Sequence, residues 1–537
     1  MLKTRRKFAT RLLALPVVLL ATSVTQPASG ANAVVSCPIP TTGYGHMFPT
    51  LAAVSWSDAD MTTLSEALIA PAEDSVPTTP RDAEENMNIA AGWTYFGQFI
   101  DHDLTFDNRP NDLTTPVDPA TLINARTPQL DLDNVYGSLP TLSPTLYTSD
   151  GTHLNVGLLQ TGSPTAETRD LPRNAYQQAV IGDPRDDENR MVAAIHASFI
   201  RLHNTIVDQL IAAHPTWALT EVFTKARAEV VTIYQTIVIT EYLPTILDKN
   251  VLDKVLFQRG KTWQSRTRFY TTCAQMPIEF SVAAYRFGHS QVRSFYQLNT
   301  TTSPLPVFSG TYDPRKDVAG FQNAPTDFAV DWSYFLQSPK PPKGAKPLTG
   351  TNPDSKLQYS YRIDASLTNS LSLLPLPASG SGPANLAKRN VLRAVQLGLP
   401  SGQDVARQIG VTPLPADQIL LGKATTDVGA SQKLVDVVPS MGTKTPLWVY
   451  VLAEVSAHAY KIKDGHIVGN QRAPFTLGAV GSTVVAETFA GLLASDPASV
   501  LNTTTPAPQM RLWDVVTNKT PIQPPIPPMP PLSRIRR

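Results

Sequence analysis

Two short segments that lie far apart in the chain each place a histidine beside other polar side chains. In the first, Gln98, Asp101 and His102 stand at positions i, i+3 and i+4 of an expected helix, so one helical face presents all three. In the second, His289 follows an arginine, a phenylalanine and a glycine. A single histidine is most often a hydrogen-bonded core residue, but two such segments together indicate a site that holds iron.

Helices are expected to position both segments. The clearest helical pattern runs from Asp187 to Ala213, where apolar residues recur at steps of three and four, and Asp186 or Asp187 can cap its start. Strand signals are few and short, so the sequence predicts a mainly α protein. From residue 83 the sequence is expected to become helical and to stay mostly so. Further helices are expected at 61–70, at 219–243, from 280 through His289 toward 298, and at 386–397, 401–409, 446–457 and 479–493.

The first 33 residues are typical of a targeting segment. Residues 4–8 resemble a twin-arginine signal, residues 12–22 form an apolar run, and small residues at 31–33 suit a peptidase. The apolar run is too short to span a bilayer, so we expect no integral membrane segment in the mature chain and a secreted or periplasmic location. Cleavage would remove five basic and no acidic residues and turn the net charge of +1 into −4, which gives no support for nucleic-acid binding.

The composition suits a large folded enzyme. At 537 residues, with 42% apolar and 17% charged residues, the chain exceeds the usual size of one domain, although a helical enzyme of this length can be a single unit. Two cysteines, Cys37 and Cys273, are too few for a disulfide scaffold, and whether they pair stays open. The sequence does not define the oligomeric state.

Five collinear segments identify the family that the chain resembles. They cover residues 97–104, 127–138, 182–188, 286–289 and 389–400. In this order they resemble the animal-type haem peroxidases of the peroxidase–cyclooxygenase superfamily, here as a bacterial secreted member. The resemblance implies a large single-domain helical haem peroxidase fold. It divides the chain into a signal peptide at 1–33, a loop-rich segment at 34–85, the catalytic domain at 86–502 and a Pro-rich tail at 503–537.

The resemblance assigns roles on the side of the haem where peroxide binds. His102 matches the distal histidine, Gln98 a distal-pocket residue and Arg185 the distal arginine. Asp101 and Glu188 match the two carboxylates that form ester links to the haem.

On the other side of the haem, His289 matches the proximal ligand of the iron. Asn390 matches the asparagine that hydrogen-bonds the proximal imidazole, and Arg286, three residues before His289, is expected to be a further cofactor-binding residue. The implied cofactor is haem b. We interpret His196 and His203, at i and i+7 of the long helix, as structural residues.

A second metal is implied by the segment that follows the first histidine. Asp103 is expected to point away from the face that carries His102, toward this segment. Alternating loop positions can deliver several oxygen ligands to a Ca²⁺ ion, and an Asx-rich turn is the alternative interpretation. The residues that match the calcium site of the family are Asp103, Thr127, Gln129, Asp131 and Asp133.

The predicted function is a peroxidase that uses H₂O₂ to oxidise bromide, iodide, thiocyanate or phenolic donors through a ferryl intermediate, with a role in the response to oxidative stress. One alternative is a haem-dependent fatty-acid dioxygenase, but Arg286 occupies the position where those enzymes have a radical tyrosine. The second is an exported matrix or adhesion protein without turnover. Asn189 stands where one family member has a haem-linked methionine, which argues against efficient chloride oxidation.

Overall fold

The computed structural model describes residues 43–72, 84–107, 112–165, 167–271, 275–310, 313–339, 356–374, 382–427, 429–469, 471–503 and 510–521. The predicted signal peptide, both cysteines, most of the loop at 338–355 and the Pro-rich end of the tail lie outside these residues. The predicted division into segments therefore stays a prediction.

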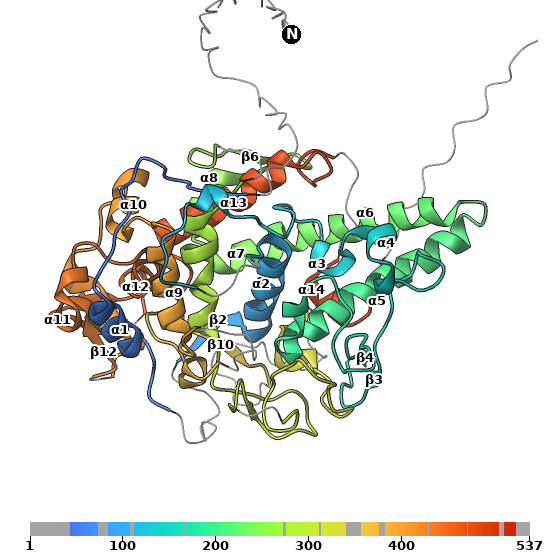
Figure 1. The fold of residues 1–537 in the computed structure, drawn as a ribbon, viewed down its shortest axis with the longest axis horizontal. Coiled ribbons are helices and arrows are strands. Elements are labelled where there is room, and N and C mark those ends of the chain that lie inside the picture. The colour runs from blue at the N-terminus through green and yellow to red at the C-terminus, as the bar shows by residue number, and fades with distance from the viewer. Residues whose placement is uncertain are drawn as a thin grey trace, which may run out of the picture. The chain divides into compact units, whose positions relative to one another are not determined.

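Helices dominate the described part of the chain, which confirms the predicted mainly α class (Figure 1). The α-helices are α1 Asp58–Ala67, α2 Ala91–Leu104, α3 Asp133–Tyr136, α4 Leu139–Leu142, α5 Arg190–Ala213, α6 Leu219–Ile237, α7 Leu243–Ile246, α8 Lys249–Val255, α9 Leu386–Gln396, α10 Gly402–Ile409, α11 Leu434–Val437, α12 Leu447–Ala459, α13 Ala479–Ser495 and α14 Leu512–Val516.

The strands that the structure describes form only two-stranded sheets. One pair is parallel, β1 Tyr44–Gly45 with β7 Met276–Pro277. The antiparallel pairs are β2 Glu85–Ala90 with β10 Tyr359–Tyr361, β3 Leu159–Gln160 with β4 Thr168–Arg169, β5 Leu256–Arg259 with β6 Thr262–Ser265, β8 Phe295–Tyr296 with β9 Leu305–Pro306, β11 Leu420–Gly422 with β12 Ser431–Lys433, and β13 Lys461–Lys463 with β14 His466–Val468.

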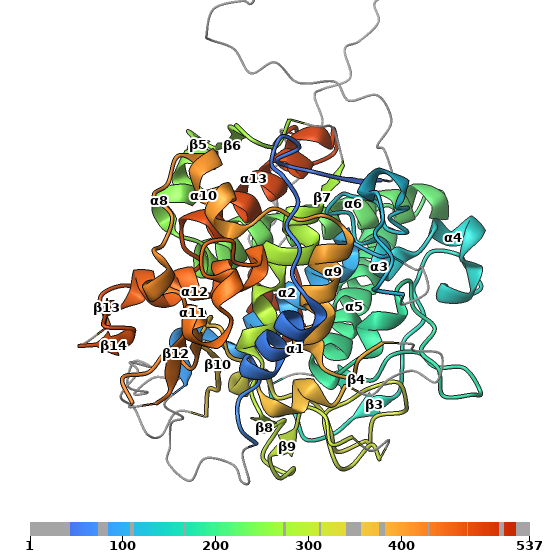
Figure 2. The same cartoon turned by 60° about the vertical axis from the view of Figure 1, so that its left-hand side comes forward.

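Helix α2, which carries the first histidine segment, lies in the middle of the helices, with α5 and α6 on one side and α10 and α12 on the other (Figures 1 and 2). It packs directly against α5, where Phe99 stacks on Phe199 with ring centroids 5.2 Å apart. Aromatic pairs of this kind add about 0.5–1.5 kcal/mol to the burial of their area. This packing fixes the face of α2 that the site uses.

Helix α5 follows its predicted periodicity but starts later than predicted. Met191, Ile195 and Phe199 are fully buried, as the steps of three and four require. Its cap is Asn189, whose side chain accepts a hydrogen bond from the backbone N–H of Val192 at 3.0 Å. The prediction that Asp186 or Asp187 caps this helix is wrong, because both carboxylates bind side chains elsewhere.

The second histidine segment is not the regular α-helix that the sequence predicted. A π-helical turn at Glu279–Ala283 leads into a 3₁₀ segment at Ala284–Gln291, which ends before Phe295 enters β8. Side chains bind the carbonyls of this stretch, because Arg286 Nε donates to Ser281 O at 3.1 Å and Trp448 Nε1 donates to the carbonyl of Arg286 at 3.2 Å. Such contacts compete with regular helical pairing, and short π and 3₁₀ pieces often mark functional positions.

Gly97 allows the side chain of Tyr242 to approach α2, and the carbonyl of the same glycine contacts the second histidine segment. A Cβ at this position would lie 2.4 Å from the hydroxyl oxygen of Tyr242, which is too close for any side chain. The hydroxyl of Tyr285 donates to the carbonyl of Gly97 at 3.3 Å. The two segments that carry the histidines are therefore in direct contact.

Among the described residues, none of the helices combines the length and the apolar character that crossing a bilayer requires.

Candidate active site

The polar face of α2 lies against the short 3₁₀ turn Pro184–Asp187 and the residues that follow it. Gln98 Nε2 donates to Glu188 Oε2 at 2.8 Å, and its own oxygen accepts from Asn189 at 3.0 Å. His102 is buried, and its Nδ1 is 2.8 Å from Asp186 Oδ1. The predicted proximity of Gln98 and His102 to the segment that carries Glu188 is thus present in the structure.

Arg185 is fixed at the C-terminal end of α2. Its Nε and Nη2 donate to the two oxygens of Asp183 at 3.0 and 2.7 Å, and Nη2 also donates to the carbonyl of Thr105 at 2.5 Å. The ring of Phe106 lies 4.5 Å below the guanidinium. Burial disfavours its charge, but the hydrogen bond and charge of Asp183 outweigh burial and raise the pKa of Arg185, so it remains a cation.

The ionisation of His102 reflects opposing effects. Burial and the charge of Arg185 favour the neutral ring, but the hydrogen bond to Asp186 and the charges of Asp186 and Glu188 together outweigh them and raise the pKa of His102 above its ordinary value. Burial raises the pKa of Glu188, which borders the same side chains. The arrangement combines a histidine, a permanent cation and a carboxyl group of raised pKa, which is typical of sites that move protons.

His289 contacts Asn390, a fully buried residue of α9. The amide nitrogen of Asn390 lies 2.8 Å from His289 Nδ1, and its oxygen accepts from Arg286 Nη1 at 2.7 Å. In this arrangement Arg286 donates to the oxygen of the amide and the nitrogen faces Nδ1, which places the proton of the ring on Nε2. Binding a metal through Nε2 requires the amide to turn, so that its oxygen accepts from Nδ1–H. Burial and the charge of Arg286 lower the pKa of His289 to about 3. The ring is therefore neutral, as a metal ligand must be.

Several of these side chains lie deep in the protein but still have accessible surface, which means that they border a space. Gly288 supports this, since a Cβ added there would meet nothing within 4 Å. Burial lowers the pKa of Arg286 to about 10. Asp101 is close enough to Arg286 for its charge to oppose this effect in part. The side chains that share this property are Gln98, Asp101, Arg185, Glu188, Arg286 and His289.

The donor set fits an iron porphyrin. A neutral imidazole supplies the nitrogen ligand that haem iron takes in peroxidases, and the oxygen of Asn390, once the amide is turned, would accept from Nδ1–H and orient the ring. The guanidinium of Arg286 suits an anionic group of the cofactor, and the carboxyl groups of Asp101 and Glu188 lie close enough to Arg185 to raise its pKa.

A second cluster joins α2 to the loop before α3. One carboxylate oxygen each of Asp103, Asp131 and Asp133 lies within 4.8 Å of the others. Burial and the charges of its two neighbours raise the pKa of Asp103 well above its usual range, and burial raises that of Asp133 to about 7. Asp103 Oδ2 is buried without a hydrogen-bond partner in the described part of the chain. A cation would relieve both the repulsion and the unpaired oxygen.

The other predicted calcium ligands are only partly drawn into this cluster. The hydroxyl of Thr127 donates to Asp131 Oδ1 at 2.7 Å, and its backbone N–H donates to Asp133 Oδ2 at 2.8 Å. For Gln129 the observed contact is of its backbone, which donates to the carbonyl of Thr127 at 2.7 Å. Two arginines, at positions 126 and 227, partly offset the negative charge.

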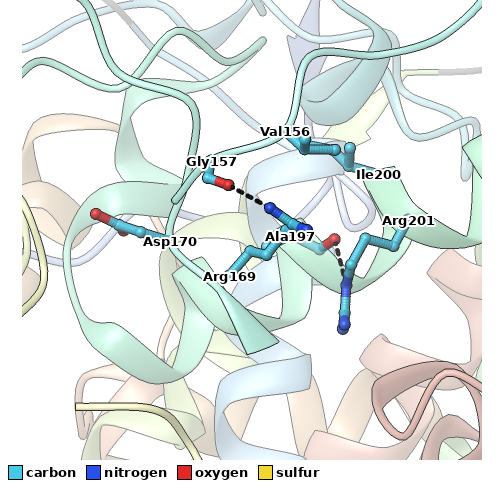
Figure 3. A pocket seen from close by; sticks show the side chains of 7 residues that line it. All are labelled: Val156, Gly157, Arg169, Asp170, Ala197, Ile200 and Arg201. Atoms are coloured by element: carbon cyan, nitrogen blue, oxygen red, sulfur yellow. Dashed lines mark hydrogen bonds between the residues drawn. The ribbon is translucent and has the colours of Figure 1, made fainter. Parts of the chain in front are cut away.

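A small pocket of about 150 Å³ is lined by other residues (Figure 3). This volume includes open solvent and encloses no space for a water, so the pocket cannot hold a porphyrin. Its two arginines already have partners, since Arg169 donates to the carbonyl of Gly157 at 3.2 Å and Arg201 to that of Ala197 at 3.4 Å (Figure 3). We assign it no part in the site.

Sequence reasoning missed Asp186, the residue that binds His102. It interpreted Asp186 as a helix cap, because an aspartate just before an apolar repeat is the usual signal for one. Nothing in the spacing indicates a partner 84 residues earlier in the chain.

Comparisons with known proteins agree with this fold. The sequence model of the animal haem peroxidase family matches residues 107–308, which confirms the resemblance that the motifs predicted. The matched region includes the loop that carries Asp131 and Asp133, together with Arg185, Glu188 and His289, whereas α2 and Asn390 lie outside it.

The curated relatives are much longer than the matched part. Peroxinectin A of Dictyostelium discoideum is 26% identical over 239 residues, which are 44% of this chain and 38% of that protein. Thyroid peroxidase of Mus musculus is 26% identical over 353 residues, 63% of this chain and 36% of that protein. The chain thus spans less than two fifths of the length of these relatives.

Solved structures share the fold at low identity. Peroxidase A from Dictyostelium discoideum has a TM-score of 0.57 at 16% identity and covers 90% of this chain and 91% of its own. The fatty acid alpha-dioxygenase of Arabidopsis thaliana has a TM-score of 0.53 at 15% identity and covers 88% of this chain and 75% of its own. At such identities the likeness concerns the fold alone.

Proposed function

We propose that the protein is a haem peroxidase that uses H₂O₂ to oxidise bromide, iodide, thiocyanate or phenolic donors. One observation carries this proposal. The segments of His102 and His289 are in direct contact, with Arg185 beside the first histidine and Asn390 bound to the second, which is neutral. The match to the sequence model of the animal haem peroxidase family supports it.

The proposed roles follow from the chemistry of each side chain. His289 would bind the iron of haem b, and the bound haem supplies the redox chemistry. His102 would take a proton from H₂O₂ and return it to the departing oxygen, as a general base and then a general acid. Arg185 would stabilise the negative charge that develops when the O–O bond breaks.

Two further roles and a location are part of the proposal. Asp101 and Glu188 would form ester links to the cofactor, and mass spectrometry of the haem-bound peptides would test this. The basic and apolar start of the chain supports export to a secreted or periplasmic location. Fractionation of cells that express the full chain, with N-terminal sequencing of the exported form, tests the export and the predicted cleavage.

The optical spectrum of the haem-supplied protein tests the function most directly. We expect a Soret band that shifts when H₂O₂ is added and returns when bromide or a phenol is offered. Oxygen uptake that depends on a fatty acid and not on peroxide would instead favour the dioxygenase. A protein that takes up no haem would contradict both enzymatic functions.

We propose that the cluster of Asp103, Asp131 and Asp133 binds Ca²⁺ and so holds α2 from the side away from His102. Saturating Ca²⁺ is expected to stabilise the wild type by about 2.7 kcal/mol at a hundredfold excess over the dissociation constant, measured as a rise in Tm. Asp103→Asn should lose this response. Without Ca²⁺ it should be as stable as the wild type or more so, because one repelling charge is gone.

Asp112→Asn is the matched control for this experiment, since Asp112 is exposed and binds only nearby threonines. It should respond to Ca²⁺ like the wild type. An equal response of the Asp103 and Asp112 variants would contradict the calcium proposal.

The bridge that Asn390 makes between Arg286 and His289 leads to two opposite expectations. Asn390→Ala should weaken haem retention by about 10- to 100-fold, because the imidazole loses the contact that orients it. Asn390→Asp can accept from both neighbours, so it should retain haem and lower the reduction potential by making His289 a stronger donor. Haem transfer to haem-free myoglobin and spectroelectrochemistry measure the two effects.

Lys388→Ala is a suitable control on the same helix, since Lys388 contacts Thr62 rather than the site. It should match the wild type in both measurements. A shift of potential in the same direction for both Asn390 variants would argue against this role.

A further inference from the structure

Asp186 is a fully buried carboxylate that no part of the proposed function has used. Its Oδ1 lies 2.8 Å from Nδ1 of His102, and its Oδ2 lies 2.6 Å from Nδ1 of His196 and 3.0 Å from the amide nitrogen of Asn134. One residue therefore connects α2, α3 and α5 through the 3₁₀ turn on which it sits.

The charge state of Asp186 determines what its neighbours must be. Burial alone would raise its pKa, but the hydrogen bonds from His102 and His196 outweigh burial and lower the pKa. An ionised carboxylate only accepts hydrogen bonds, so the Nδ1 atom of His102 must carry a proton. In the neutral ring this leaves the lone pair on Nε2, the nitrogen that does not face Asp186.

We propose that Asp186 is the positioning residue of the site, which fixes both the orientation and the tautomer of His102 so that Nε2 acts as the base. This inference rests on the proposed peroxidase function, because it assigns the base of that reaction. His196 and Asn134 take part through Asp186, since they hold its second oxygen in place. The sequence had suggested only a structural role for His196. In this proposal it also holds the carboxylate that orients His102.

The surroundings of Asp186 decide how an asparagine would lie in its place. Two donors face Oδ2, from His196 and Asn134, whereas only His102 faces Oδ1. The amide oxygen of Asp186→Asn should therefore take the Oδ2 position. Reversal is disfavoured, because Nε2 of His196 is buried without a partner among the described residues and would have to carry the proton that leaves Nδ1.

The amide nitrogen of the variant then faces His102 and donates to its Nδ1. The proton of His102 moves to Nε2, and the base is lost although the shape of the side chain is almost unchanged. Asp186→Ala removes the hydrogen bond without enforcing either tautomer. The positioning role therefore predicts that asparagine, the closer match in shape, impairs the site more than alanine does.

Cyanide binding to the haem-supplied full-length protein tests this apart from turnover. Hydrogen cyanide must give up its proton as it binds, whereas carbon monoxide binds the reduced protein without a proton transfer. We expect Asp186→Asn to slow cyanide association by about 10²-fold, the lower end of what general base catalysis contributes. Asp186→Ala should slow it less, and carbon monoxide association should be unaffected in both.

Asp187→Asn is the matched control, because Asp187 is the adjacent buried aspartate and pairs with Arg173 at 2.7 Å instead of a histidine. It should leave cyanide association within about twofold of the wild type, since its contacts do not include His102. Equal effects of the Asp186 and Asp187 variants, or a larger effect of alanine than of asparagine at 186, would overturn the inference.

The same samples separate this inference from the proposed function. If the wild type oxidises donors with H₂O₂ but cyanide binding ignores Asp186, the function stands and the inference fails. If cyanide binding depends on Asp186 as described but H₂O₂ and donors give no turnover, the inference stands and the function fails. A wild type that binds no haem overturns both.

Discussion

Replacing His102 by glutamine is expected to lower the second-order rate constant for the reaction with H₂O₂ by about 10²–10⁴-fold, the range that a positioned acid–base group contributes. Glutamine keeps much of the volume and a polar end, so the packing of α2 against α5 should survive. It cannot take a proton from H₂O₂ and return it to the leaving oxygen. Stopped-flow measurement of the Soret change after mixing with H₂O₂ gives the rate constant directly.

His203→Gln is the control for this substitution. His203 is an equally buried histidine of α5, and its ring nitrogens contact the hydroxyl of Tyr136 and the carbonyl of Thr152 at 3.1 and 2.9 Å. Its loss should cost about 1–3 kcal/mol of stability through an unpaired neighbour and leave the rate constant unchanged. If His102→Gln reacts with H₂O₂ as fast as His203→Gln does, His102 is not the base.

The sequence was most informative where a local pattern determines the structure. Helix α5 is visible from its apolar steps because one of its faces packs along its whole length. The converging carboxylates of Asp131 and Asp133 follow from alternating loop positions, which deliver side chains to one point. Both are short-range properties of the chain.

Long-range contacts account for the rest. The interpretation of Asp186 as a cap was wrong because its partner His102 is supplied by packing between α2 and α5, which the local sequence does not describe. The segment before His289 was predicted as a regular helix, since its composition is helical. The indole N–H of Trp448, from α12, donates a hydrogen bond to the carbonyl of Arg286 in that segment. No pattern within the segment indicates this contact.

The pair of Asn390 and His289 shows a third case. The two residues are 101 positions apart, and their contact was expected from the family resemblance rather than from spacing. The structure adds a contact that the resemblance did not specify, from Arg286 to the oxygen of the amide. Resemblance therefore predicted which residues meet, and only the coordinates show which atoms face each other.

His289→Gly is expected to weaken haem retention by more than about 100-fold, because it removes the metal ligand itself, whereas the loss of a residue that only supports a ligand costs about 10- to 100-fold. The pKa of about 3 keeps this histidine neutral at every ordinary pH, so no proton has to leave before it binds a metal. Spectrophotometric titration of the purified variant with haem measures the loss.

Free imidazole should restore part of what this variant loses. The glycine leaves room for a ligand of the same size, and the position before it already borders open space, since a Cβ at Gly288 would meet no atom within 4 Å. Because Asn390 and Arg286 stay in place, added imidazole can take up the same hydrogen bond and should recover the Soret band and the peroxide response together. His214→Gly, at the distant end of α5, controls for nonspecific effects of imidazole. If His289→Gly holds haem as well as this control does, with or without imidazole, His289 is not the ligand of the iron.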